Sequence, residues 1–242
     1  HRRIPSTWQT CRGRGTGARS GAPTLTVSVR EKSSTLWEPE KVRLAFVLGG
    51  VAFEDVRVPH ADWPALKPST PYGQLPILEI DGAVMGQSEA MLRYAGELTP
   101  SLYPEGKRVE IDELLGLVAD CDRAWIPAFL VTLRPAQLGY PADFAGSAEQ
   151  AVRAKVMRDK FLANDLPRFC GYFSARLERT GAFLTGDTPT IADCAVVTEL
   201  RKFTFGTIEH IPADCLDKFP AITAYIERFL ALPAVKAYYE TK

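Results

Sequence analysis

The pattern of hydrophobic and polar residues divides the chain into two parts. From Thr24 to Leu98, short apolar runs of strand length alternate with segments in which apolar residues recur every three to four positions, as on one face of a helix. The runs predict strands at residues 24–30, 53–58, 75–80 and 83–86, and the helical spacing predicts helices within residues 36–50 and from residue 88 to 98. The predicted order is βαβ, then ββα.

Turn and helix-boundary residues support this order. The dipeptide Asp81-Gly82 lies between two predicted strands and is among the strongest short signals for a β-hairpin. Pro39 is tolerated in the first turn of the first helix, and the pair Gly49-Gly50 is a typical helix end. These signals indicate a small α/β domain over residues 24–99.

The later part of the chain has helical spacing throughout. A linker with proline and glycine, residues 100–106, precedes it. The helical stretches are residues 111–129, 148–180, 190–203 and 220–232. We expect a bend near Pro167, because proline interrupts the helical hydrogen bonds. The sequence therefore predicts an all-α domain over residues 107–242.

Charge and composition exclude two classes of partner from those that we expect, nucleic acid and membrane. Residues 1–23 contain five arginines and no acidic residue, so we expect a disordered tail, either a remnant of an organelle transit peptide or a cloning or gene-model artefact. The remainder carries 24 basic and 29 acidic residues without a concentrated Lys/Arg face, so nucleic acid is not an expected partner. No apolar run approaches the roughly 20 residues that cross a bilayer, so we expect no membrane partner.

The cysteines and histidines indicate neither disulfides nor a metal. The five cysteines are far apart and show no CxxC or zinc-finger spacing: Cys11, Cys121, Cys170, Cys194 and Cys215. We predict free and mostly buried thiols, as in a reducing compartment. The three histidines are equally scattered, and no metal site is expected.

The most informative stretch is YGQLPILEIDGAVMGQSEAMLRYAGEL, residues 72–98, with a proline inside a short strand and Gln-Ser at the start of a helix. Together with the preceding ADWPALKPSTP, it resembles the cytosolic glutathione transferases, and most of all the sigma class, which includes prostaglandin D synthases. The resemblance extends from about Thr24 to Lys242. It implies a thioredoxin-like N-terminal domain that binds glutathione and an all-helical C-terminal domain.

The proline and the Gln-Ser pair have roles that physical chemistry explains. An X-Pro bond becomes cis at modest cost, and a cis Leu75-Pro76 bond would turn the N–H and C=O of Leu75 outward. In the resembled family this bond is cis and pairs with the cysteinyl unit of glutathione. Gln87 and Ser88 lie at a predicted helix N-terminus, which favours an anion such as the γ-glutamyl carboxylate. The alternative is that Pro76 only bounds a strand and Ser88 only caps a helix.

The resemblance implies four further glutathione contacts. Trp63 and Lys67 would contact the glycyl carboxylate, and Gln74 would lie beside the backbone of Leu75. Asp120 would reach across a dimer interface to the ammonium group of the ligand. The alternatives are an ordinary solvated lysine at position 67 and an ordinary exposed helical aspartate at position 120.

The catalytic hydroxyl departs from the sigma pattern. A free thiol has a pKa of about 8.5, so a transferase needs a hydrogen-bond donor that stabilises the thiolate of glutathione. Sigma-type enzymes use a tyrosine at the end of the first strand, where this chain has Val27. No tyrosine lies between residues 24 and 50, and the usual arginine at the start of the first helix is replaced by Glu38.

Other glutathione transferases use a serine in the loop after the first strand. We favour Ser33 or Ser34 as the thiolate donor, with Ser28 as a third candidate. Thr35 and Glu38 have the spacing of a capping box, which would occupy the hydroxyl of Thr35. The alternative is that all these hydroxyls only solvate the loop or cap the helix.

Two signals in the helical half concern packing. Thr190 to Asp193 has the [ST]-x-x-[DE] capping pattern, so Asp193 is expected to cap a helix rather than to act as a catalyst. Six residues could line an apolar pocket for an electrophile or simply belong to the core: Leu117, Trp125, Phe129, Phe203, Phe205 and Tyr239.

The expected function is that of a cytoplasmic, homodimeric detoxification transferase. Glutathione would be the co-substrate, and its thiolate would attack a hydrophobic electrophile or reduce an organic hydroperoxide. An organellar location is the alternative if residues 1–23 are a transit remnant. The alternative functions are a non-catalytic binding or structural protein of the same fold and a glutathione-dependent isomerase.

Overall fold

A computed structural model describes residues 23–30 and 37–241. The chain divides into two compact units, the first ending at Ala95 and the second beginning at Gly96. This division falls inside a helix, a few residues before the predicted linker at 100–106. The predicted domain limits remain a prediction.

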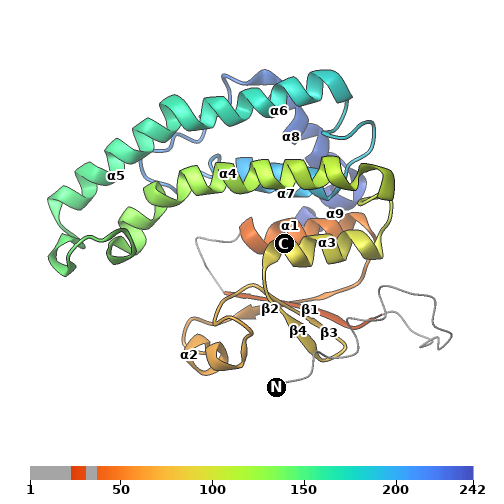
Figure 1. Cartoon of the computed structure of the whole chain (residues 1–242), viewed down its shortest axis with the longest axis horizontal. Coiled ribbons are helices and arrows are strands. Elements are labelled where there is room, and N and C mark those ends of the chain that lie inside the picture. The colour runs from red at the N-terminus through yellow and green to blue at the C-terminus, as the bar shows by residue number, and fades with distance from the viewer. Residues whose placement is uncertain (1–22, 31–36, 242) are drawn as a thin grey trace. The chain divides into compact units, whose positions relative to one another are not determined.

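The first unit is built on a mixed four-stranded sheet of order β2-β1-β3-β4 (Figure 1). Its strands are β1 (Leu25–Arg30), β2 (Glu54–Val58), β3 (Ile77–Ile80) and β4 (Ala83–Met85). Strand β1 pairs with β2 in parallel and with β3 antiparallel, which places Val27 opposite Asp55 and Leu78. The order confirms the predicted βαβ, then ββα.

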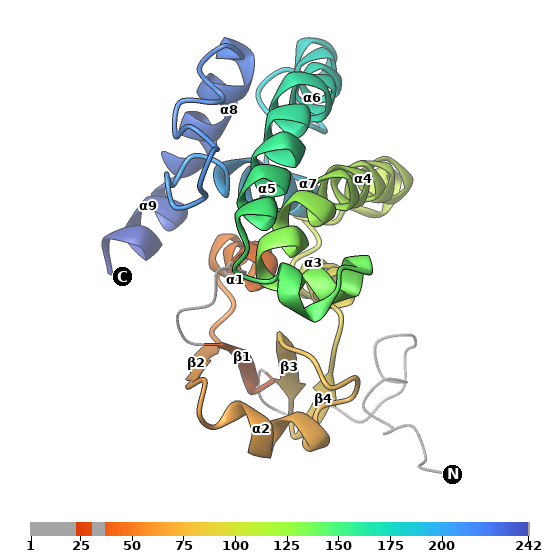
Figure 2. The same cartoon turned by 90° about the vertical axis from the view of Figure 1, so that its left-hand side faces the viewer.

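Helices cover both faces of this sheet. Figures 1 and 2 show α1 (Trp37–Leu48) and α3 (Ser88–Leu98) on one face and the short α2 (Trp63–Leu66) on the other. Alternate residues of β1, from Leu25 to Val29, are buried, as the alternating pattern of a half-buried strand requires. The arrangement is the thioredoxin-like fold expected from the sequence.

The β3–β4 hairpin turns at the predicted dipeptide. Asp81 has a φ of 48° and Gly82 a φ of 82°, so both central residues have the positive φ of a type I′ turn. The Asp81 carboxylate also accepts a hydrogen bond from the backbone N–H of Thr24 over 3.0 Å. This contact ties the turn to the beginning of β1.

The described part of the second unit is helical, as predicted. Its α-helices are α4 (Arg108–Leu133), α5 (Ala148–Lys160), α6 (Leu166–Thr180), α7 (Ile191–Arg201), α8 (Pro220–Leu230) and α9 (Pro233–Glu240). Helix α4 packs against α5 and α7, and α8 packs against α6 and α7. Helix α7 is buried along nearly its whole length and forms the centre of this unit.

The interruption expected near Pro167 is a π-helical segment. It covers Phe161–Asp165 and joins α5 to α6, which follow one another in Figure 1. Pro167 lies in the first turn of α6, where a missing backbone N–H is tolerated. The π-helical segment therefore ends just before the first turn of α6, which contains the proline.

Trp125 and Phe203 could line an apolar pocket or belong to the core, and the structure places both in the core. Each is 1% exposed, and their ring centroids lie 5.1 Å apart in an edge-on contact. Phe161 packs on both rings. Phe205, in contrast, is 55% exposed.

None of the helices in the described residues combines the length and the apolar character needed to cross a membrane.

The four cysteines in the described part of the chain are buried free thiols, as predicted. Burial raises the pKa of Cys170 to about 12 and the pKa of Cys215 to about 11. Burial also raises the pKa of Cys121 and of Cys194. These thiols are therefore protonated at neutral pH and unsuited to act as nucleophiles.

Thiol labelling tests this property. In a Cys11→Ser variant at pH 8, we expect a chromogenic disulfide reagent to label the native protein more slowly than the urea-unfolded protein by about 10²-fold or more, because the thiolate fraction and access are both small. Rapid labelling of even one native cysteine would contradict the buried, high-pKa assignment.

Candidate functional site

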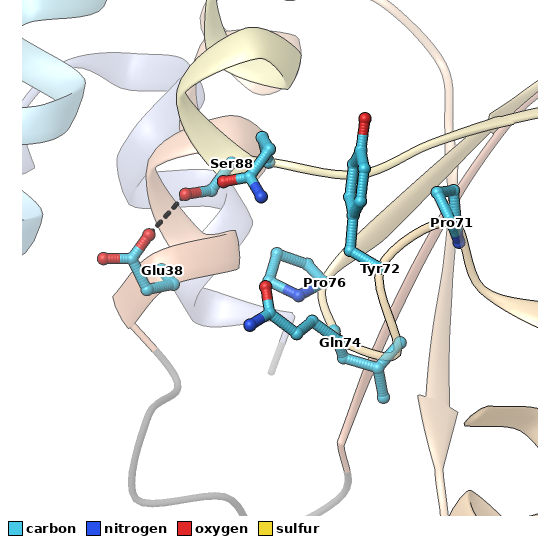
Figure 3. A pocket seen from close by; sticks show the side chains of 9 residues that line it. Glu38, Pro71, Tyr72, Gln74, Pro76 and Ser88 are labelled. Carbon is cyan, nitrogen blue, oxygen red and sulfur yellow. Dashed lines mark hydrogen bonds between the residues drawn. The ribbon is translucent and has the colours of Figure 1, made fainter. Parts of the chain in front are cut away.

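A pocket of about 190 Å³ lies in the first unit where three chain segments meet (Figure 3). The segments are the loop before β3, the junction between β4 and α3, and the first turn of α1. Its lining residues are Glu38, Pro71, Tyr72, Gln74, Leu75, Pro76, Gly86, Gln87 and Ser88. The pocket thus joins residues about 50 positions apart in the sequence.

The loop before β3 has a backbone that few residues could adopt. The Leu75-Pro76 peptide bond is cis, as predicted. Gly73 has a φ of 63°, and a Cβ at this position would lie 3.3 Å from Cε of Lys67. Glycine meets both constraints because it accepts positive φ and has no side chain. Lys67 therefore lies alongside the loop that carries Gln74 and Leu75.

The junction between β4 and α3 shapes the opposite side of the pocket. Gln87 has a φ of 71°, and its carbonyl accepts hydrogen bonds from the N–H groups of Ala90 and Met91, which begins α3. The side chain of Gln87 lines the pocket. A Cβ on Gly86 would lie 2.8 Å from Cδ2 of Tyr72, so glycine allows the Tyr72 ring to form the adjoining wall.

Glu38 is the charged side chain among the described residues that line the pocket. The hydroxyl of Ser88 donates a hydrogen bond to the Glu38 carboxylate, as Figure 3 shows. Lys41 Nζ lies 3.1 Å from the same carboxylate and 2.8 Å from that of Glu89. Glu38 is therefore held between a hydroxyl and an ammonium group.

Lys41 keeps its charge although only 7% of its side chain is exposed. Burial would lower the pKa of Lys41, but the carboxylates of Glu38 and Glu89 outweigh this effect and raise the pKa above its ordinary value. The ammonium group therefore remains protonated at neutral pH. It contacts the same carboxylate oxygen of Glu38 that accepts the hydrogen bond from Ser88.

Five predicted glutathione contacts meet at this pocket: Gln74, Leu75, Pro76, Gln87 and Ser88. Trp63 is buried in α2, and Lys67 is exposed next to it; neither lines the pocket. Asp120 belongs to the second unit, where it is exposed and paired with Arg123. Their proposed contacts remain predictions.

Of the three candidate thiolate donors, the structure describes Ser28 alone. Ser33 and Ser34 lie outside the described residues, as does Thr35 of the predicted capping box. Ser28 lies within β1, between Val56 of β2 and Ile77 of β3, and is not part of the pocket lining. The choice among these serines therefore remains a prediction.

Sequence reasoning missed the contact between Glu38 and Ser88 and the burial of Lys41. The available signal was Glu38 itself, an acidic residue where the resembled family has an arginine. The spacing between Glu38 and Lys41 is also that of a helical ion pair. The partners Ser88 and Glu89 lie about 50 residues away, and no local pattern connects them to α1.

The polar groups of the pocket are suited to bind the end of a small peptide, which carries amide and carboxylate groups. Two amide side chains, from Gln74 and Gln87, can donate and accept hydrogen bonds, and the start of α3 favours a carboxylate. Pro76 and Tyr72 provide apolar walls. Within the described ranges, no group of three His, Cys, Asp or Glu side chains is arranged to hold a metal ion.

Family models match both parts of the chain. A model described as "Glutathione S-transferase, N-terminal domain" matches residues 39–105. A model described as "Glutathione S-transferase, C-terminal domain" matches residues 142–242. The first match includes the loop before β3 and the junction before α3.

Curated and solved relatives are similar over most of their length. Probable glutathione S-transferase 7 of Caenorhabditis elegans is 32% identical, over 84% of this chain and 90% of the relative. Glutathione S-transferase 1 of Ascaris suum is 32% identical, over 82% and 88%. The structure of prostaglandin synthase D of Nilaparvata lugens superposes with a TM-score of 0.73 at 25% identity, over 91% and 98%.

Proposed function

The chain belongs to the glutathione S-transferase family, a family of enzymes that use glutathione as co-substrate, and we propose that it activates the glutathione thiol for attack on electrophilic small molecules. The observation that carries the proposal is the meeting of Gln74, the Leu75-Pro76 bond, Gln87 and Ser88 around one pocket. These residues come from two segments on either side of the β3–β4 hairpin.

Glutathione would bind in an extended form along this pocket. Its cysteinyl unit pairs with the backbone of Leu75 in the manner of an added strand. Its γ-glutamyl carboxylate faces the start of α3 and the amide of Gln87. Lys67 would bind the glycyl carboxylate with Trp63, a role supported by the position of Lys67 against Gly73 in the same loop.

The thiolate would be stabilised by the hydroxyl of Ser33 or Ser34, with Ser28 as the third candidate. The thiol proton passes to solvent, the sulfur forms a bond to the electrophilic carbon, and the leaving group departs with the bonding electron pair. Reduction of an organic hydroperoxide would use two glutathione molecules, which become a disulfide while the hydroperoxide becomes an alcohol and water.

The assembly and location also belong to this proposal. We expect a homodimer, in which Asp120 of one subunit approaches the ammonium group of glutathione bound to the other. A hydrophobic electrophile is the expected second substrate. We expect the protein to act in the cytoplasm, because the resembled transferases are cytosolic.

Separate serine substitutions test the catalytic proposal. With a chlorinated nitrobenzene as electrophile, we expect Ser33→Ala or Ser34→Ala to lower kcat by about 10- to 100-fold, because a hydrogen bond to a charged group is lost. The KM for glutathione should change little, since the serine contacts the sulfur and not the peptide. Ser28→Ala, in the middle of β1, tests the third candidate in the same assay.

The pH profile of the same variants separates catalysis from binding. At saturating glutathione, loss of the thiolate donor should shift the rise in kcat/KM for the electrophile to higher pH. The reason is that the bound thiol regains a pKa closer to that of a free thiol. Full activity and an unchanged profile in all three variants would remove serine from the mechanism. Retention of wild type on glutathione resin, with elution by free glutathione, checks the binding site independently.

A glutathione-dependent isomerase is the second candidate. It is favoured by the hematopoietic prostaglandin D synthase of Gallus gallus, which is 28% identical over 84% of this chain and 90% of the relative. Turnover of an endoperoxide substrate without net consumption of glutathione would support it. Consumption of glutathione with the chlorinated nitrobenzene supports the transferase instead.

A further inference from the structure

Arg201, in the last turn of α7, lies against two aromatic rings that the core of the second unit does not cover. Its guanidinium carbon is 5.3 Å from the ring centroid of Phe205 and 4.9 Å from that of Tyr239 in α9. Phe205 is 55% exposed, and Arg201 and Tyr239 are partly exposed. Both rings belong to the aromatic residues that could line an electrophile pocket, and neither has the buried position of Trp125 and Phe203.

The guanidinium of Arg201 makes no ion pair or hydrogen bond with the residues that the structure describes. The neighbouring Lys202 differs, because its buried ammonium group lies 2.9 Å from the Asp122 carboxylate and 2.6 Å from that of Glu199. A guanidinium has five N–H donors at the edge of its plane, and they stay available when its face lies over a ring. Arg201 is therefore a positive charge whose hydrogen-bond donors can meet a ligand.

The charge and the two rings together indicate the class of ligand. The planar edge of a guanidinium matches a carboxylate, to which it can donate two parallel hydrogen bonds. The rings of Phe205 and Tyr239 offer apolar surface to a flat aromatic body. An aromatic carboxylate uses all three side chains, whereas a neutral aromatic compound uses the rings alone and an inorganic anion uses the guanidinium alone.

We propose that Arg201, Phe205 and Tyr239 form a binding site for aromatic carboxylates, and that this site gives the enzyme a preference for aromatic electrophiles with a carboxylate group. The second part of this inference rests on the proposed transferase function and deepens it, whereas the binding itself requires no glutathione. Arg201 determines specificity: it holds the carboxylate, accepts no proton and forms no bond to the reacting carbon.

Two matched ligands test the binding site without turnover. The ligands are para-chloro-meta-nitrobenzoate and the corresponding benzamide, which share the ring, the nitro group and the chlorine and differ in charge. By titration calorimetry without glutathione, we expect wild type to bind the benzoate at least about fivefold more tightly, because hydrogen bonds between charged groups are the stronger ones. Arg201→Gln should bind the benzoate at least about fivefold more weakly and the benzamide within about twofold of wild type.

Arg168 provides the matched control, because its guanidinium also lies over a ring but has a carboxylate partner. It is 4.8 Å from the ring centroid of Phe169 and 2.9 Å from the carboxylate of Asp165. Arg168→Gln should leave both affinities within about twofold of wild type. Arg201→Lys should retain only part of the preference, since lysine keeps the charge without the planar fork. Phe205→Ala, at an exposed position, should weaken the binding of both ligands.

Turnover of the same two compounds extends the test to the reaction. The glutathione sulfur forms a bond to the carbon that carries the chlorine, chloride leaves with the bonding electron pair, and the thiol proton passes to solvent. Arg201→Gln should lower kcat/KM for the benzoate by about fivefold or more, mainly through a higher KM. The value of kcat/KM for the benzamide should stay within about twofold of wild type.

The outcomes separate this inference from the proposed function. Wild type that binds the benzoate preferentially but conjugates neither compound, nor the chlorinated nitrobenzene, would overturn the transferase function. Wild type that conjugates the benzamide but binds both compounds equally would overturn only the role of Arg201, as would an Arg201→Gln variant that keeps the preference. If Arg201→Gln does not fold, unchanged affinity of Phe205→Ala for the benzoate would overturn the site.

Discussion

Replacing Asp193 with alanine is expected to lower the free energy of unfolding by about 3–5 kcal/mol, because several buried donors lose their acceptor at once. Asp193 is fully buried at the start of α7. Its carboxylate accepts hydrogen bonds from the N–H and hydroxyl of Thr190, the N–H of Leu184 and the hydroxyl of Tyr225. These contacts join three segments of the second unit.

The chemistry of Asp193 explains why so many donors are required. Burial raises the pKa of the Asp193 carboxyl, and the hydrogen bonds from Leu184, Thr190 and Tyr225 act in the opposite direction. All of these partners donate, which an acceptor-only carboxylate satisfies. The predicted capping role is confirmed, and the carboxylate additionally holds Tyr225 of α8.

Urea denaturation of three variants measures this effect. Tyr225→Phe removes one hydrogen bond and should cost about 1 kcal/mol. Asp187→Ala, in the exposed loop before α7, should change the free energy of unfolding by no more than about 0.5 kcal/mol. An Asp193→Ala variant as stable as Asp187→Ala would show that Asp193 does not organise this unit.

Replacing Gln87 with glycine is expected to weaken glutathione binding by about 10- to 100-fold, the range for loss of a hydrogen bond to a charged group. The Gln87 amide lines the pocket beside the start of α3. Glycine is the appropriate replacement because Gln87 has a φ of 71°, where alanine would add backbone strain. The substitution therefore removes the side chain without disturbing the turn.

Thermal unfolding and calorimetry separate the two effects of this substitution. The Tm should remain close to wild type or rise slightly, because glycine adopts this φ without strain. His210→Gly is the matched control: it relieves a φ of 59° in the second unit and should leave the affinity unchanged. Unimpaired glutathione binding by Gln87→Gly would place the γ-glutamyl end elsewhere.

Local patterns in the sequence predicted much of this structure. Short apolar runs identified the strands, and Asp81-Gly82 identified the hairpin, because turn chemistry acts over a few residues. The capping box of Thr190 and Asp193 was recognisable for the same reason. The five glutathione contacts predicted at the pocket were recognisable by resemblance, since they lie in the single stretch from Gln74 to Ser88.

Contacts between distant segments were beyond local patterns. The bond from Tyr225 to Asp193 joins residues 32 positions apart, and Lys41 reaches Glu89 over 48 positions. Whether such side chains meet depends on the packing of whole elements. Lys41 illustrates the difficulty, because a lysine on a helix is usually solvated, whereas here two carboxylates permit its burial.

The central claim is that a glutathione molecule lies against Leu75 and the start of α3. Titration of ¹⁵N-labelled protein with glutathione, followed through backbone amide signals, tests it most directly. We predict saturable shifts for the amides of Leu75, Gln87 and Ser88, while exposed glycines of the second unit such as Gly139 and Gly146 stay unchanged. The absence of saturable shifts, or shifts that leave all three predicted amides unmoved, would contradict this site.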